Sequence, residues 1–323
     1  MRTKAATVFV SIALGLAPSV SFAAALSATQ VSSVLALLSA FGVSQTTIAQ
    51  VEKALGVANT TPAVPADPPA PQNTYLPPVG SPYFTGDMGY DISYSTTAYP
   101  AEAFGYSVIG VGGGRAFYDN ARLSSQLAWA HNFATHVAPT VYMNLNAPYG
   151  KKVAGNLAGP RSCPGITASS QKVASADGEP SACEGYNYGY NAAQHAYAYA
   201  RDHDVTGSFW WLDIEEANSW SEDTAVNDAT IQGAIDALNT HGIRAGIYSM
   251  TYMWKNIAGT SFSPAQTIAG KAVTTPSWFP IGIKTRTEAL NACHTATSFI
   301  KDSPIWIIQY VEDSTSVDQN IAC

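Results

Sequence analysis

The sequence is poor in charged residues. They make up 12% of its 323 residues, about half of the usual share of about 25%, and the formal net charge is −7. No run rich in Lys and Arg occurs. Its absence excludes the basic surface that binds nucleic acids and the polybasic contact that binds membranes. Polarity comes instead from uncharged side chains and 17 tyrosines, a composition typical of exported proteins that handle neutral polymers such as glycans.

Metal-ligand and cofactor motifs are also lacking. The six histidines are scattered, and no two of the four cysteines form a Cys-x-x-Cys motif. The glycine-rich run at 110–114 lacks the GxGxxG spacing and the following Lys of a phosphate loop. We therefore expect neither a metal nor a cofactor, and we interpret the run as a loop at the end of a strand.

The four cysteines predict two disulfides, because an even number in an exported protein is typical of paired thiols. Three pairings are possible. We favour Cys163–Cys183, which would close an excursion rich in Gly, Pro and Ser. Cys293–Cys323 would then tie the C-terminus to the helix that precedes it.

Residues 1–25 are typical of a secretory signal. Arg2 and Lys4 give the basic start, residues 5–17 are apolar, and 21–23 (SFA) form a small-x-small cleavage site. The alternative is a membrane anchor, but the apolar stretch is short for a bilayer. We expect a protein that is secreted, periplasmic or associated with the cell wall, with no membrane span after signal cleavage.

Two further segments precede the main domain. Residues 26–56 predict a helical hairpin, because Ser27 and Gln30 form a capping box, apolar residues recur at helical spacing, and Gly42 separates two such patterns. A stalk with residual helicity is the alternative. Residues 57–82 hold eight of the 19 prolines and predict an extended, semi-rigid linker.

Residues 83–323 predict one α/β domain, in which apolar strand patterns alternate with helical patterns. The expected strands are 88–93, 106–111, 140–145, 208–214, 244–249, 278–283 and 304–311, and the expected helices are 121–136, 191–202, 224–241 and 288–300. Such alternation predicts a parallel sheet. The number of strands and the length favour a TIM-type (β/α) barrel, irregular with fewer than eight helices, over an open sheet.

Acidic residues follow three of the expected strands. Asp91 ends the first strand, Asp213 and Glu215 end the fourth, and Asp318 follows the last. Because strands of such a barrel end at one mouth, we expect the four carboxylates to converge. Neighbouring carboxylates raise each other's proton affinity, so one can keep the proton that glycoside hydrolysis needs. The spacing leaves retention and inversion open, and a structural loop cap or a calcium site is the alternative.

Aromatic residues lie on the same strands. Sugar rings stack on aromatic faces, and we take Tyr142, Trp211, Tyr248 and Tyr310 as candidate substrate-binding residues. Along the fourth strand, Trp211 points to the same side as Asp213 by alternation. The alternative is that these rings only fill the barrel core.

Five segments carry the motifs of one known family. They are GYDIS (89–93), YSVIGVGGGRAFYDN (106–120), WWLDIEEANSW (210–220), GIRAGIYS (242–249) and IWIIQYVEDSTSVDQN (305–320). Over nearly all of residues 86–323 the chain resembles family 25 glycoside hydrolases, the barrel-type lysozymes of peptidoglycan. The long loop between 148 and 186 and the lack of wall-binding repeats resemble a lysozyme-like branch of that family.

The resemblance implies a role for each acidic residue. It makes Glu215 the proton donor and has Asp213 orient the acetamido group of the substrate. Asp91 and Asp318 would complete the acidic cluster, and Tyr248 would line the site. The implied reaction is cleavage between N-acetylmuramic acid and N-acetylglucosamine. We expect the protein to be a monomer. A cell-wall glycan-binding protein without turnover and a glycosidase for another amino-sugar polymer are the alternatives.

Overall fold

The computed structural model describes residues 80–148, 157–165, 179–205, 207–313 and 317–323. The predicted signal peptide, the predicted helical hairpin and most of the predicted linker lie outside the described residues, so these domain boundaries stay predictions.

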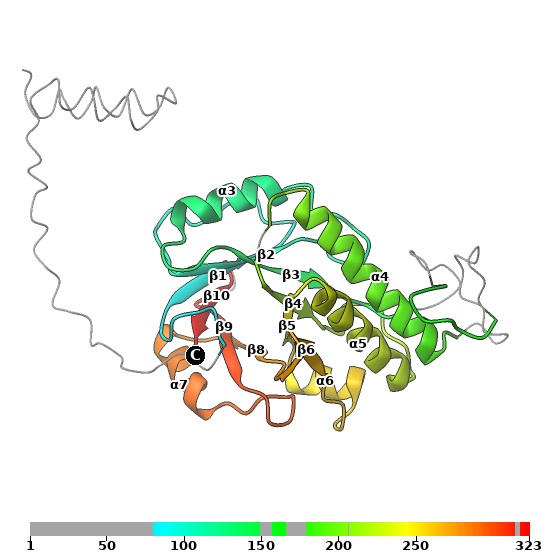
Figure 1. Ribbon diagram of the computed structural model, residues 1–323. Coiled ribbons are helices and arrows are strands. Elements are labelled where there is room, and N and C mark those ends of the chain that lie inside the picture. Colours follow the sequence, from blue (N-terminus) through cyan, green and yellow to red (C-terminus); the bar gives the residue numbers. More distant parts are fainter. Residues whose placement is uncertain (1–79, 149–156, 166–178, 206, 314–316) are drawn as a thin grey trace, which may run out of the picture. The chain divides into compact units, whose positions relative to one another are not determined.

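Eight strands close into a barrel, as predicted (Figure 1). The barrel strands are β1 (Met88–Ile92), β2 (Tyr106–Gly110), β3 (Thr140–Asn144), β4 (Phe209–Asp213), β5 (Arg244–Tyr248), β8 (Ser277–Ile283), β9 (Ile305–Val311) and β10 (Gln319–Ala322). Around the barrel their order is β1-β10-β9-β8-β5-β4-β3-β2. Two short strands, β6 (Gln266–Ile268) and β7 (Lys271–Val273), form a separate antiparallel pair.

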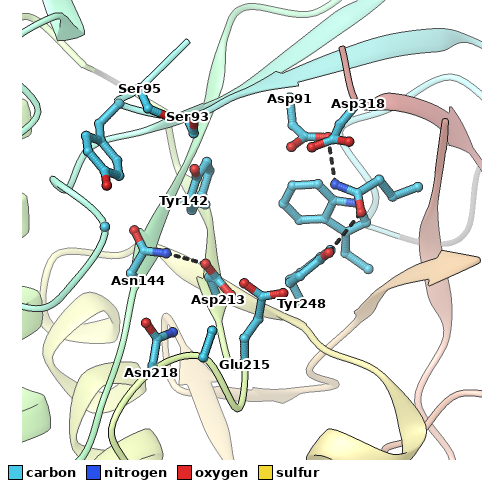
Figure 2. A pocket seen from close by; sticks show the side chains of 15 residues that line it. Asp91, Ser93, Ser95, Tyr142, Asn144, Asp213, Glu215, Asn218, Tyr248 and Asp318 are labelled. Carbon is cyan, nitrogen blue, oxygen red and sulfur yellow. Dashed lines mark hydrogen bonds between the residues drawn. The ribbon is translucent and has the colours of Figure 1, made fainter. Parts of the chain in front are cut away.

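The strand β10 departs from the predicted parallel sheet. It pairs antiparallel with both β1 and β9, whereas the other barrel pairings are parallel. Asp318 therefore follows β9, as expected, but it does not follow the last strand, because it directly precedes β10. Since β10 runs in the opposite direction, its beginning lies at the end of the barrel where the parallel strands finish. That direction brings Asp318 to the mouth together with the ends of β1 and β4 (Figure 2).

The described residues contain five helices, in line with an irregular barrel. They are α3 (Leu123–Phe133), α4 (Ala182–Arg201), α5 (Thr224–Thr240), α6 (Thr251–Ala258) and α7 (Arg286–Thr295). The predicted start of α4 at Asn191 is wrong, because Ser181 and Glu184 form a capping box that begins the helix earlier. The prediction placed the end of α7 at Ile300, beyond its observed end, and missed α6. Among the described residues, no helix has both the length and the apolar character needed to cross a bilayer.

Large rings fill the inside of the barrel below the mouth. They fit because the facing positions are glycines: a Cβ atom at Gly246 would collide with the ring of Trp211, and one at Gly110 with the ring of Tyr142. The indole of Trp211 donates a hydrogen bond to the hydroxyl of the buried Tyr83 at 2.8 Å. The interior of the barrel is therefore a packed core.

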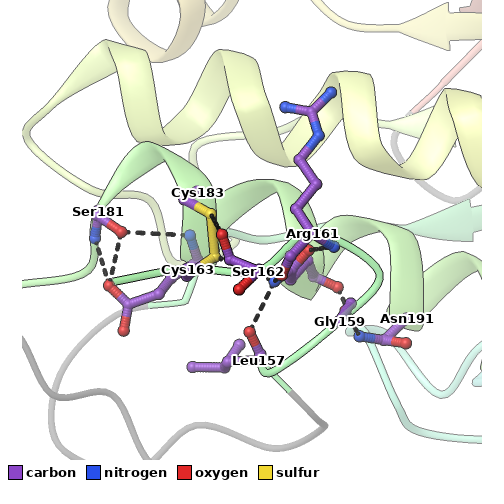
Figure 3. The surroundings of a disulfide bond; sticks show 10 residues. Leu157, Gly159, Arg161, Ser162, Cys163, Ser181, Cys183 and Asn191 are labelled. Atoms are coloured by element: carbon purple, nitrogen blue, oxygen red, sulfur yellow. Dashed lines mark hydrogen bonds between the residues drawn. A yellow bond between two sulfur atoms is a disulfide. The ribbon is translucent and has the colours of Figure 1, made fainter. Parts of the chain in front are cut away.

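Both favoured disulfides are present. Cys163–Cys183 joins the segment before α4 to the first turn of that helix, with a Cα–Cα distance of 5.7 Å (Figure 3). The side-chain amide of Asn187 donates to two carbonyl oxygens of the same segment, at 2.7 Å each. Cys293–Cys323 ties α7 to the C-terminal residue, which follows β10.

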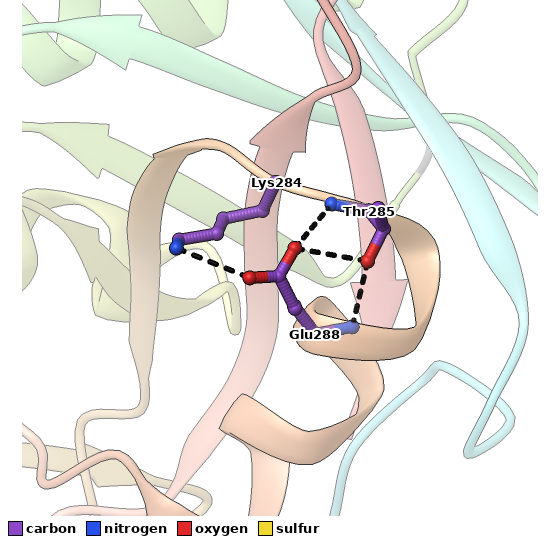
Figure 4. Close-up of polar contacts among 3 residues, drawn as sticks. All are labelled: Lys284, Thr285 and Glu288. Atoms are coloured by element: carbon purple, nitrogen blue, oxygen red, sulfur yellow. Dashed lines mark hydrogen bonds and ion pairs between the residues drawn. The ribbon is translucent and has the colours of Figure 1, made fainter.

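The helix α7 begins with a second capping box (Figure 4). The carboxylate of Glu288 accepts hydrogen bonds from the backbone N–H and the hydroxyl of Thr285, at 2.9 Å each, and from Lys284 at 3.2 Å. These donors favour the ionised form and lower the pKa of Glu288 to about 2. The capping box fixes the first residue of α7, the helix that carries Cys293 of the second disulfide.

Candidate active site

A pocket of about 410 Å³ opens at the mouth of the barrel. All four predicted carboxylates line it: Asp91, Asp213, Glu215 and Asp318 (Figure 2). The fifteen lining residues include no Lys, Arg or His. Among the described residues, no group of three or more His, Cys, Asp or Glu side chains is arranged to hold a metal ion. The described lining of the pocket is therefore acidic and contributes no basic side chain.

Asp213 and Glu215 form one carboxyl pair. Asp213 is buried, and the amide of Asn144 donates a hydrogen bond to its Oδ2. Burial raises the pKa of Asp213 well above its usual range, and the charge of Glu215 raises it further. Burial also raises the pKa of Glu215, although a hydrogen bond with Asp213 opposes that rise. The pair titrates as a unit and can keep a proton where isolated carboxyls are ionised.

Asp91 and Asp318 form a second carboxyl pair. Two amides orient Asp91: Gln309 donates to its Oδ2 at 2.9 Å, and Asn320 donates to the same atom at 2.7 Å. Burial raises the pKa of Asp91 well above its usual range, and the charge of Asp318 adds to the rise. Burial also raises the pKa of Asp318. The hydroxyl of Tyr248 donates to Gln309 at 2.8 Å, so β5 and β9 position this pair jointly.

The predicted aromatic residues divide into two groups. Tyr142 and Tyr248 line the pocket. Trp211 points into the barrel with Asp213, as alternation predicts, but it is fully buried one layer deeper, 4.9 Å from Phe209 between ring centroids. Tyr310 belongs to an apolar cluster on the outer side of β9 that includes residues of α7 and β10. The structure thus places Trp211 and Tyr310 in the core and outside the pocket.

Several lining residues escaped the sequence analysis. Asn144 ends β3 in the same way as Asp213 ends β4, so the strand-end rule was sufficient to find it. Gln309 and Tyr310 are neighbours on β9, so their side chains point to opposite faces of the strand. Strict alternation would therefore have placed Gln309 inside the barrel once Tyr310 was assigned to the outside. Asn218 and Tyr94 lie on loops that carry no such periodicity.

The raised pKa values predict how stability depends on pH. Since the four carboxyls hold protons more tightly in the folded state, folding should bind protons above about pH 4, the usual pKa of a free carboxyl. The free energy of unfolding should therefore fall as pH rises from about 4 towards neutrality. Asp213→Asn keeps an oxygen that can accept from Asn144, and it should raise the free energy of unfolding at pH 7 by about 1 kcal/mol.

Urea unfolding at pH 5 and pH 7 measures this difference. Glu222→Gln changes an exposed carboxyl outside the pocket and serves as the control. A loss of stability in Asp213→Asn at both pH values would show that the ionised carboxyl holds the fold together, and would contradict the prediction.

The part of the chain that contains Asp213 and Glu215 matches a known family. Residues 179–269 match the family model described as lysozyme-like protein 1. This segment is lysozyme-like. It runs from α4 through β4, α5, β5 and α6 to the end of β6 and contains the carboxyl pair of Asp213 and Glu215. The predicted resemblance to a lysozyme-like branch is confirmed for this segment.

Individual proteins are similar to parts of the chain. Lysozyme-like protein 5 of Caenorhabditis elegans is 40% identical over 52 residues, which are 16% of this chain and 24% of that protein. The modular autolysin LytC of Streptococcus pneumoniae is similar in structure, with a TM-score of 0.43 and 9% identity. The modular Cpl-1 endolysin, solved with a peptidoglycan analogue, has a TM-score of 0.37 and 15% identity. The aligned parts cover 76% and 74% of this chain and 51% and 54% of those two chains.

Proposed function

We propose that the protein is a peptidoglycan glycoside hydrolase that cleaves between N-acetylmuramic acid and N-acetylglucosamine. The observation that carries this proposal is the carboxyl pair of Asp213 and Glu215 at the barrel mouth, in the lysozyme-like segment, with the pKa of both raised by burial. A glycosidic oxygen is a poor leaving group unless it is protonated, so a carboxylic acid that stays protonated near neutrality is what this reaction needs.

In this proposal Glu215 is the proton donor. It is the less buried member of the pair, so a sugar in the pocket can reach it. The glycosidic C–O bond breaks as Glu215 gives its proton to the leaving oxygen, while the acetamido oxygen of the substrate bonds to the anomeric carbon. Water then opens that bond and returns a proton to Glu215. Asp213 orients the acetamido group, and Asn144 holds Asp213 in place.

The second carboxyl pair supplies negative potential on the other side of the pocket. The sugar ring gains positive charge as the C–O bond breaks, and Asp91 and Asp318 are placed to stabilise that charge. Tyr248 fixes Gln309, which in turn fixes Asp91. Tyr142, on the pocket wall, provides an aromatic surface for the sugar.

The organisation of the whole chain belongs to the same proposal. Residues 1–25 would direct export, and the mature monomer would act outside the cell or at the cell wall. The predicted hairpin of 26–56 and the linker of 57–82 would precede the catalytic barrel of 83–323. The matches to lysozyme-like proteins support the proposal that the chain acts on cell-wall glycans.

Incubation of the full chain with purified cell walls tests the proposed function. New reducing ends should appear, and reduction with borohydride should convert N-acetylmuramic acid, and not N-acetylglucosamine, to its alcohol. Reduced N-acetylglucosamine would assign a different bond. Co-sedimentation with walls without new reducing ends would contradict hydrolysis and favour the glycan-binding alternative.

A further inference from the structure

One exposed aromatic ring lies at the edge of the acidic pocket. Tyr94, in the loop after β1, is 45% exposed and lines the pocket. Other large aromatic residues are at least as exposed, among them Phe84 at 54% and Tyr252 at 53%, and neither of these lines the pocket. The position of Tyr94 beside the pocket sets it apart from these other exposed rings.

The ring of Tyr94 rests against the glycine-rich loop after β2. Gly114 has a φ of +86°, and an added Cβ atom would lie 2.6 Å from Cε1 of Tyr94. A residue with a side chain at this position would thus be strained in its backbone and would displace the ring. This glycine belongs to the run that we interpreted as a loop at the end of a strand, and it makes room for an aromatic side chain.

The backbone that carries Tyr94 is held by hydrogen bonds on both sides. Thr96 N–H donates to the carbonyl of Ser93 at 3.1 Å, and the hydroxyls of Ser93 and Ser95 lie 2.9 Å apart. Ser93 and Ser95 line the same pocket (Figure 2). These bonds hold the backbone of the turn that carries Tyr94.

Two buried amides connect this turn to the barrel. Gln126 of α3 donates to the carbonyl of Ser93 at 2.7 Å, and Asn120 donates to Gln126 at 2.7 Å and to the carbonyl of Gly110 at 2.6 Å. Both amide side chains are fully buried. Because the turn is held in this way and the ring lies against the glycine-rich loop, little backbone entropy is lost when a ligand stacks on Tyr94, which favours binding.

We propose that Tyr94 is a specificity-determining residue on which one sugar of a bound glycan stacks, next to the sugar at Glu215. The inference rests on the proposed glycosidase function. Aromatic rings bind the apolar C–H face of a sugar, and a pocket without a cationic side chain favours a neutral chain of sugars over an anionic ligand. The glycan would leave the acidic pocket across the turn of Ser93 to Thr96.

Three variants of the full chain test the inference: Tyr94→Ala, Tyr94→Phe and the control Phe84→Ala. The control removes a ring of similar exposure that does not line the pocket. On soluble cell-wall glycan fragments, Tyr94→Ala should raise KM about tenfold with little change in kcat, because a stacking contact is lost. Tyr94→Phe, which keeps the ring, should stay within about twofold of the wild type, and so should Phe84→Ala.

Binding of the same fragments, measured by calorimetry, gives a second readout that needs no turnover. An unchanged KM and affinity in Tyr94→Ala, or an equal loss in Phe84→Ala, would overturn the role of Tyr94 and leave the hydrolase proposal standing. If Tyr94→Ala weakens glycan binding but the wild type forms no new reducing ends, hydrolysis would be overturned and the role of Tyr94 in glycan binding would stand. Absence of any glycan binding by the wild type would overturn both.

Discussion

Glu215→Gln is expected to lower kcat for cell-wall cleavage by about 10²–10⁴-fold, the usual cost of losing a general acid. The substitution keeps the size of the side chain and removes the proton that the glycosidic oxygen would receive. KM should change little, because Gln can still make hydrogen bonds to a bound sugar. Counting new reducing ends on purified walls, at saturating substrate, measures the loss directly.

Glu216→Gln is the matched control for this experiment. Glu216 is the exposed neighbour of Glu215, does not line the pocket, and accepts a hydrogen bond from Asn256 at 2.6 Å. Its replacement should leave kcat within about twofold of the wild type. Equal release of reducing ends by Glu215→Gln and wild type would show that the proton comes from another group.

The second large effect concerns the contact between α4 and α5. A Cβ atom at Gly189 of α4 would collide with the backbone carbonyl of Thr230, and one at Gly233 of α5 with the carbonyl of Tyr186. The two helices thus approach so closely that only glycine fits. Gly189→Ala should lower the free energy of unfolding by about 3 kcal/mol, because backbone atoms cannot move aside as a side chain can.

Urea unfolding followed by circular dichroism measures this loss. Gly207→Ala is the control, since the nearest atoms to its Cβ would be 3.9 Å away. It should change the stability by less than about 0.5 kcal/mol. If Gly189→Ala were as stable as the control, the helices would be able to separate at little cost, and the close approach would not be a constraint on the fold.

The strands and the acidic residues could be predicted because they follow simple rules. The strands β2 and β4 are buried along their whole length on both faces, and β4 therefore appears in the sequence as the nearly continuous apolar run FWWLD. Parallel strands end at one mouth, so Asp91 and Asp213 could be brought together without knowledge of any contact. The disulfide pairing could be predicted from the segments that each bond would close. These are the excursion between Cys163 and Cys183 and the segment between Cys293 and Cys323.

What could not be predicted depends on contacts rather than on periodicity. The strand β10 is short and begins with Gln319 and Asn320, so no apolar run marks it. The first half of α4 contains Gly185 and Gly189, poor helix formers that are needed for the contact with α5. The turn that carries Tyr94 is held through Ser93 by the buried amide of Gln126 from α3, which no local pattern reveals.

The position of β10 also has a consequence for biosynthesis. The barrel closes only when β10 inserts between β1 and β9, which precede it in the chain. Until Gln319–Ala322 have left the ribosome, both neighbours keep an unpaired edge. The nascent domain therefore cannot complete its acidic pocket early, and the Cys293–Cys323 bond can form only once Cys323 has been made. Insertion of β10 is thus the step that converts an open sheet into a molecule able to hold a ligand.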